Sequence, residues 1–235
     1  FKTAFDTILG GAGIESYSLS RFDMRFDSFD PEHYRDYAKL NRYLISALAV
    51  TYNVQNCYDS RNLFSQKQVS VAIKNKRFEC ENYDKEAESG GRDPAYARLE
   101  LRSKCLTSND IEKQFHGWYI RLDKALKNLD KVHQRYNDEL EKIYKEEKDA
   151  FPVKFRSLTD FLIQYQNCIF CKAQMVDLLS RFDEVKNPET RAKNHKKRYG
   201  IEYFSKMDVE YAVAEIKRAA EKFFEGTEMN LFEKS

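Results

Sequence analysis

Three short segments in the first half of the chain alternate charged and hydrophobic residues. In SRFDMRFDSFDP (20–31), Arg and Asp alternate from position 21 to 27 with Phe or Met between them. The segments KRFECENYDKEAE (76–88) and AYARLELRSK (95–104) follow the same pattern. Successive side chains of a β-strand point to opposite faces, so each segment predicts a strand with one apolar face and one charged face.

Carboxylates on these charged faces could bind a metal ion. Asp23, Glu81 and Glu100 are the candidate ligands, because hard divalent cations such as Mg²⁺ or Mn²⁺ prefer oxygen donors. The arginines that alternate with the acids are candidates for holding phosphate groups; they are Arg21, Arg25, Arg98 and Arg102. The alternative interpretation is structural, since cross-strand Arg–Glu pairs also stabilise ordinary sheet surfaces.

Two tyrosines are candidate nucleophiles for a phosphodiester polarised by such a metal. Tyr83 lies in the NYDK segment, and Tyr119 lies in FHGWYIRL, after the third charged segment. A tyrosine that attacks phosphorus leaves the protein covalently joined to the nucleic acid. The chain has 15 tyrosines, so packing is the alternative role for each of them.

The predicted strands need a helix to cover their apolar faces, and residues 31–52 have the pattern of one. Asp30 is expected to cap its N-terminus and Pro31 to occupy the first helical position. Residues 17–27 are expected to form the first strand, and a hairpin is expected to turn at 74–76. We therefore expect an α+β fold with an N-terminal antiparallel sheet backed by a helix.

The second half of the chain has the periodicity of helices. Apolar residues recur every three or four positions from 111 to 143, which predicts one long helix over 109–148. A second helix is expected over 158–182 and a third over 207–224, ended by Gly226. We expect these helices to form an arm or bundle.

This change of pattern near residue 107 predicts two domains. The first, 1–107, is expected to hold the α+β sheet, and the second, 108–235, the helices. The helical part is interpreted either as a structural extension that closes the core or as an arm that binds a partner or a second copy of the chain.

A basic segment, KNPETRAKNHKKRYG (186–200), carries six Lys or Arg residues and one Glu. Its Pro and Gly indicate a loop between two helices. A basic loop with a terminal aromatic residue is a candidate contact for a nucleic-acid backbone, although charge runs are also ordinary solvated surface. The candidate contacts are Arg191, Lys193, Lys196, Lys197 and Arg198.

Five cysteines in a chain of 235 residues indicate reduced thiols rather than a disulfide framework. CIFC gives one C-x-x-C spacing, with Cys168 and Cys171 inside a helical pattern and only His195 as a distant third ligand. Zinc sites are typically built from two such pairs, so buried thiols are the favoured interpretation over zinc.

Composition indicates a soluble, cytosolic protein. Charged residues make up 33% of the chain, the net charge is +2, and no apolar run reaches the ~18 residues of a membrane span. The chain begins at Phe1 without a methionine, so an N-terminal piece is interpreted as missing, and its first residues have no signal-peptide pattern. Because the net charge is small, attraction to nucleic acid must come from local clusters of cations.

The segments SRFDMRFD, NYDKEAES and ARLELRSK together resemble the catalytic core of the replication initiation factors of small plasmids and phages. The resemblance covers roughly residues 17–106. It implies a sheet-based nuclease and DNA-strand transferase in which acidic residues bind a metal and a tyrosine takes the DNA end. Asp23 and Glu100 then correspond to metal ligands, and Tyr83 lies in the Tyr-Asp-Lys motif.

The chain departs from many of these relatives in its histidines. Many of the relatives carry two histidines separated by one apolar residue. The four histidines of this chain, His33, His116, His133 and His195, do not form such a pair. We therefore expect a nucleic-acid-binding, replication-initiator-like protein that nicks DNA with Mg²⁺ or Mn²⁺ if its chemistry is retained. The alternative is a non-enzymatic phage or plasmid protein of the same fold that binds and inhibits a host protein or ribonucleoprotein.

Overall fold

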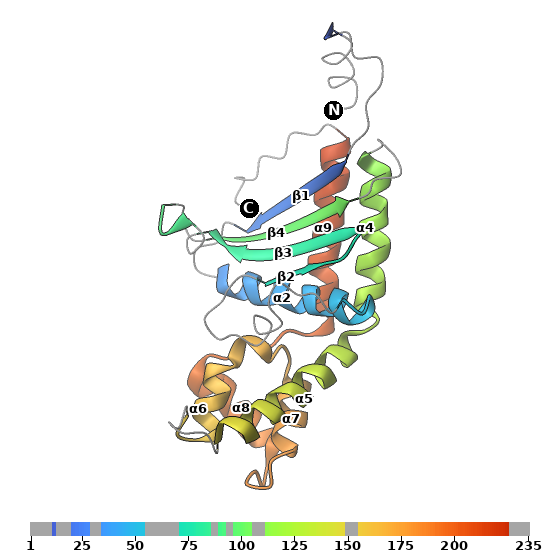
Figure 1. The fold of residues 1–235 in the computed structure, drawn as a ribbon. Helices are drawn as coiled ribbons and strands as arrows, with labels where there is room; N and C mark the ends of the chain where they lie inside the picture. Colours follow the sequence, from blue (N-terminus) through green and yellow to red (C-terminus); the bar gives the residue numbers. More distant parts are fainter. Residues whose placement is uncertain are drawn as a thin grey trace.

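The computed structural model describes residues 11–12, 20–28, 34–54, 71–85, 89–92, 96–104, 111–148 and 155–225. Four strands in these ranges form one antiparallel sheet in the order β1-β4-β3-β2 (Figure 1). They are β1 (Arg21–Ser28), β2 (Val71–Lys74), β3 (Phe78–Asp84) and β4 (Ala97–Lys104). The predicted α+β class is confirmed. The expected helix caps at Asp30, Pro31 and Gly226 lie outside the described residues.

The register of the sheet places the alternating charges side by side. Asp23 on β1 and Glu79 on β3 are the neighbours of Arg102 on β4, and Glu81 on β3 is the neighbour of Glu100. Directly paired residues in an antiparallel sheet project to the same face. The prediction that Asp23, Glu81 and Glu100 share one face is therefore confirmed.

The opposite face is apolar and lies against helices. The helices nearest to it are α2 (Tyr34–Thr51) and α4 (Ile111–Leu126), with α9 (Lys206–Phe224) beside α4 (Figure 1). Asn41 Nδ2 on α2 donates to Oδ1 of the buried Asn82 on β3 at 2.9 Å. The ring centre of Phe115 on α4 lies 6.2 Å from that of Phe26 on β1 and 6.1 Å from that of Phe224 on α9. The apolar alternation of the strands is thus explained by burial under these helices, and the helix predicted over 207–224 is confirmed.

The prediction of one long helix over 109–148 is wrong in one respect, because this segment forms two helices. α4 ends at Leu126, and α5 (Leu129–Lys148) continues in a different direction (Figure 1). At the break, Asn128 Nδ2 donates to Thr51 Oγ1 on α2 and to the carbonyl oxygen of Lys124, both at 3.1 Å. A tertiary hydrogen bond to α2 thus stabilises the turn between the two helices. The apolar periodicity continues through this turn and therefore did not predict it.

The helix predicted over 158–182 is also interrupted. The segment forms α6 (Leu158–Gln164), a 3-10 turn over Gln166–Cys168 and α7 (Lys172–Ser180). The buried side chain of Gln174 satisfies the backbone at this interruption: its Oε1 accepts from the amide of Phe170, and its Nε2 donates to the carbonyl of Cys168. Periodicity did not reveal this break because the apolar residues on both sides face the same core.

The basic segment is a helix, α8 (Pro188–Tyr199), and the loop prediction is wrong. Its Pro and Gly mark the two ends of the helix rather than a loop. Asn187 caps the N-terminus by accepting from the amide of Thr190, Pro188 occupies the first turn, and Gly200 ends the helix with a left-handed φ of 65°.

The buried side chains form one cluster that extends from the sheet through α2 and α4 to α5, α6 and α7. α4, in the predicted helical part, lies directly on the sheet, so the two predicted parts share core residues. Among the described residues, no helix is both long enough and apolar enough to cross a membrane.

Candidate functional site

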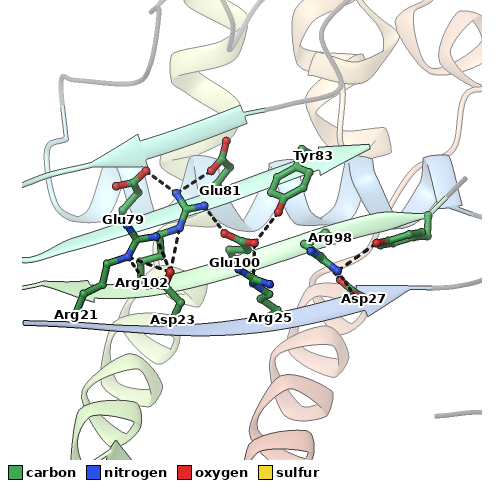
Figure 2. Close-up of polar contacts among 11 residues, drawn as sticks. Arg21, Asp23, Arg25, Asp27, Glu79, Glu81, Tyr83, Arg98, Glu100 and Arg102 are labelled. Atoms are coloured by element: carbon green, nitrogen blue, oxygen red, sulfur yellow. Dashed lines mark hydrogen bonds and ion pairs between the residues drawn. The ribbon is translucent and has the colours of Figure 1, made fainter. Parts of the chain in front are cut away.

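The candidate site is the face of the sheet opposite the helices, which we call the charged face. It carries Arg21, Asp23, Arg25, Asp27, Glu79, Glu81, Tyr83, Arg98, Glu100, Arg102 and Lys104. Figure 2 shows these side chains, apart from Lys104, on β1, β4 and β3, with Arg102 between the acids. All the candidate residues predicted from the three charged segments lie on this face.

Arg102 is the centre of the acidic group. Its Nη1 lies 2.8 Å from Glu79 and 2.9 Å from Glu81, its Nη2 donates to Glu100, and its Nε lies 3.9 Å from Asp23. Burial alone would lower the pKa of Arg102, but the surrounding carboxylates outweigh burial and raise it. The guanidinium therefore stays charged.

Glu100 connects this group to a tyrosine. The Tyr83 hydroxyl donates to Glu100 Oε1 at 2.5 Å, and Arg25 Nε lies 3.1 Å from the same oxygen. Burial raises the pKa of Glu100, but the hydrogen bonds from Tyr83 and Arg102 and the charge of Arg102 outweigh it, so the pKa lies below its usual value. Glu100 is thus ionised and accepts the hydrogen bond of the Tyr83 hydroxyl.

Tyr83 lies between this carboxylate and a second arginine. The Arg98 guanidinium carbon is 6.0 Å from the centre of the Tyr83 ring, and Arg98 is held by Asp27 through two bonds of 2.6 and 2.7 Å. Burial and the Glu100 bond raise the pKa of Tyr83 to about 12. The hydroxyl is therefore protonated at neutral pH.

The two arginines of β1 have the most exposed side chains of the charged face. The side chains of Arg21 and Arg25 are 53% and 59% exposed, whereas that of Arg102 is 16% exposed. Arg21 also donates to Asp23 at 2.5 to 3.0 Å. Both arginines lie on β1, an edge strand of the described sheet.

The acids and bases of the charged face are balanced: Asp23, Asp27, Glu79, Glu81 and Glu100 face Arg21, Arg25, Arg98, Arg102 and Lys104. In the part of the chain that the structure describes, no group of three or more His, Cys, Asp or Glu side chains is placed to hold a metal ion. The carboxylates predicted as ligands are directed at guanidinium groups. As arranged, they do not fit a divalent cation.

Tyr119, the second candidate nucleophile, lies away from the charged face. It belongs to α4, and its hydroxyl donates to the carbonyl oxygen of Lys217 on α9 at 3.1 Å. Its ring packs edge-on against Phe115, which lies on the apolar side of the sheet. The structure thus brings Tyr83, but not Tyr119, together with the predicted carboxylates.

The predicted basic contacts lie on α8, in the helical layer below the sheet in Figure 1. The side chains of Lys193, Lys197 and Arg198 are exposed. Lys196 is also exposed but pairs with Glu202 at 3.0 Å, and Arg191 is partly buried and donates to Thr159. The first three residues are therefore the cations of α8 most accessible to an anionic partner.

Two groups of the described structure were not named as candidate sites from the sequence. Glu79, which contacts Arg102 and Lys104, has the same strand parity as Glu81, which predicts it on the charged face, but it was not among the candidate site residues. His133 on α5 lies beside the Tyr43 hydroxyl of α2 and 3.5 Å from Cys171 Sγ. Sequence spacing carries no signal for this second group, because its members come from α2, α5 and the N-cap of α7.

The described cysteines, Cys80, Cys168 and Cys171, are free thiols; Cys80 and Cys168 are buried, and Cys171 is partly buried. Cys57 and Cys105 lie outside the described residues. His195 is buried on α8 beside Tyr199. Comparison of the chain with protein-family models, with curated proteins and with solved structures found no match.

Proposed function

We propose that this chain binds nucleic acid as a replication-initiator-like protein, with α8 contacting the phosphate backbone and the charged face holding the phosphodiester. The observation that carries the proposal is the charge of α8 and its flanks, where six cations and one Glu lie within residues 186–200. Lys193, Lys197 and Arg198 are exposed there. Cations in this number attract phosphates independently of base sequence.

The salt dependence of binding tests this proposal. Replacing Lys193, Lys197 and Arg198 by Gln keeps helix-forming side chains and removes three charges. If each contacts one phosphate, the slope of log K against log salt should fall by about 2.7 on duplex DNA, at about 0.9 per contact. The matched control replaces three exposed lysines of α4 and α5, Lys124, Lys131 and Lys142, by Gln.

The control variant should retain the wild-type slope. Equal slopes for the α8 variant and the wild type would remove α8 from the interface. Absence of nucleic-acid binding by the folded wild-type chain would reject the proposal and favour the alternative, a protein or ribonucleoprotein partner.

A second function, DNA-strand cleavage, is favoured by the position of the Tyr83 hydroxyl between Glu100 and Arg98. In the proposed step, Tyr83 Oη forms a bond to phosphorus and its proton passes to Glu100. The bond from phosphorus to one sugar oxygen breaks, and that oxygen leaves as a hydroxyl after taking a proton from water. Arg98 lies where it can stabilise negative charge on the tyrosine oxygen, and the exposed Arg25 where it can contact the phosphate.

Two single-hydroxyl variants test the cleavage step. Incubation with single-stranded DNA should give a covalent protein–DNA band that resists denaturant. Tyr83→Phe should abolish the band while the chain still binds DNA, because only the attacking oxygen is lost. Tyr119→Phe is the matched control, since it removes a hydroxyl bonded to the carbonyl of Lys217, and it should retain the band. A band that persists in Tyr83→Phe would exclude Tyr83 as the nucleophile.

A further inference from the structure

The position at which the acidic side chains of the charged face converge is filled by a side chain of the protein itself. Arg102 contacts Glu79, Glu81 and Glu100 and lies near Asp23, which includes all three carboxylates predicted as metal ligands. We propose that the Arg102 guanidinium is the permanent cation of this acidic centre, in place of Mg²⁺ or Mn²⁺. If Arg102 takes the place of the metal, the chain should bind and cleave DNA without a divalent cation; this consequence rests on the proposed function.

The geometry of Arg102 supports an internal cation rather than a mobile surface arginine. Nη1 is shared between Glu79 and Glu81 at 2.8 and 2.9 Å, while Nη2 is used by Glu100. Planar guanidinium groups match carboxylates in this way because their N–H groups diverge within one plane. The side chain of Glu100 is 2% exposed and that of Glu79 is 9% exposed, so both carboxylates depend on neighbouring cations for charge compensation.

The other cations of the charged face complete this compensation. Lys104 pairs with Glu79, Arg25 with Glu100 and Arg21 with Asp23. A divalent cation bound at the centre would have to displace Arg102, whose Nε is already buried without a hydrogen-bond partner. A displaced and unpaired guanidinium beside the added metal charge is strongly unfavourable in a partly buried site.

The chain offers a matched pair of variants for testing this inference. Arg102→Gln removes the central cation and leaves the four carboxylates. Arg98→Gln removes another guanidinium of β4, one that pairs with the single carboxylate of Asp27. Both variants lose one positive charge from the same strand. They differ in the number of carboxylates that lose a partner, which is larger for Arg102→Gln than for Arg98→Gln.

The experiment is titration of the full chain with Mn²⁺, without nucleic acid, following free Mn²⁺ by electron paramagnetic resonance. We expect no saturable site in the wild type or in Arg98→Gln, where only weak, unsaturated binding should be seen. In Arg102→Gln we expect one Mn²⁺ per chain, with an affinity at least ~10-fold above that weak binding. Mn²⁺ should also raise the unfolding temperature of Arg102→Gln but leave that of the wild type unchanged. Circular dichroism without metal establishes whether each variant folds.

Saturable binding of one Mn²⁺ by the wild type, lost in Glu100→Gln, would overturn the inference. A folded Arg102→Gln variant that gains no site would also overturn it. If Arg102→Gln fails to fold, the wild type still decides: an unfolding temperature that differs between Mn²⁺ and EDTA contradicts an internal cation, and an identical one supports it. Since these measurements use no DNA, they are independent of whether the proposed function is correct.

Discussion

Nε1 of Trp118 on α4 donates a hydrogen bond of 3.0 Å to Oγ of Ser103 on β4, and both side chains are buried. The Trp118 ring also lies edge-on to Phe78 of β3, with centres 5.4 Å apart. This contact joins the helical half of the sequence to the sheet. It therefore contributes to holding α4 on the apolar face, opposite the side chains of the charged face.

Trp118→Phe is expected to lower the free energy of unfolding by about 1–3 kcal/mol, because it leaves a cavity and a buried Ser103 hydroxyl without its donor. Urea unfolding followed by circular dichroism measures this change. The control is Ile120→Ala on the same helix, whose side chain is 58% exposed and whose loss should change the free energy by less than about 0.5 kcal/mol. Equal effects of the two variants would contradict the tight contact between α4 and β4.

Gly200, at the end of α8, is a position where a larger side chain should strain the backbone without colliding with neighbouring atoms. Its φ is 65°, and a Cβ added there would meet no atom within 4 Å. Gly200→Ala should therefore destabilise the chain by about 1 kcal/mol through backbone conformation alone. Gly200→Asn should cost less, because Asn tolerates the left-handed region. Thermal unfolding distinguishes the two, and wild-type stability of Gly200→Ala would contradict the helix end at this residue.

Lys39 predicts a specific dependence of stability on pH. Its Nζ is buried and donates to the carbonyl oxygen of Glu202 at 2.5 Å. Burial lowers the pKa of Lys39 from 10.5 to about 8, against the opposing charges of Cys168, Glu202, Asp36 and Cys171. Between these two pH values the unfolded chain binds more protons than the folded chain, so the contribution of Lys39 to stability increases as pH rises.

The comparison with Lys39→Met isolates this effect, since all other titrating groups are common to both proteins. From pH 8 to 10.5 the stability of the wild type relative to the variant should increase by up to about 3 kcal/mol. Urea unfolding at several pH values measures it. Parallel stability profiles of the two proteins would show that Lys39 does not titrate in this range.

The Arg98–Asp27 pair is expected to be energetically coupled, because both side chains are largely buried and joined by two hydrogen bonds. A double-mutant cycle with Arg98→Gln and Asp27→Asn should give a coupling energy of about 1 kcal/mol or more. The same cycle on Arg21 and Asp23 is the control; it should give less than about 0.5 kcal/mol, since Arg21 is 53% exposed. Equal coupling in both cycles would contradict the difference in burial.

Local alternation in the sequence was sufficient to predict β1, β3 and β4, the identity of the charged face and the helix over 207–224. A period of two or of 3.6 residues is a property of neighbouring positions, and burial of one face enforces it. The face shared by Asp23, Glu81 and Glu100 followed from parity alone, because a shift of one residue would have buried the charges under α2.

Other features were decided by contacts between residues far apart in sequence. The break between α4 and α5 depends on Asn128 reaching Thr51. Tyr83 lies beside Glu100 and Tyr119 does not, because α4 covers the opposite side of the sheet. The position of Arg102 among acids from three strands was decided in the same way. Side-chain spacing along one strand predicts the face to which a charge points, but the pairing of strands decides which opposite charge it meets.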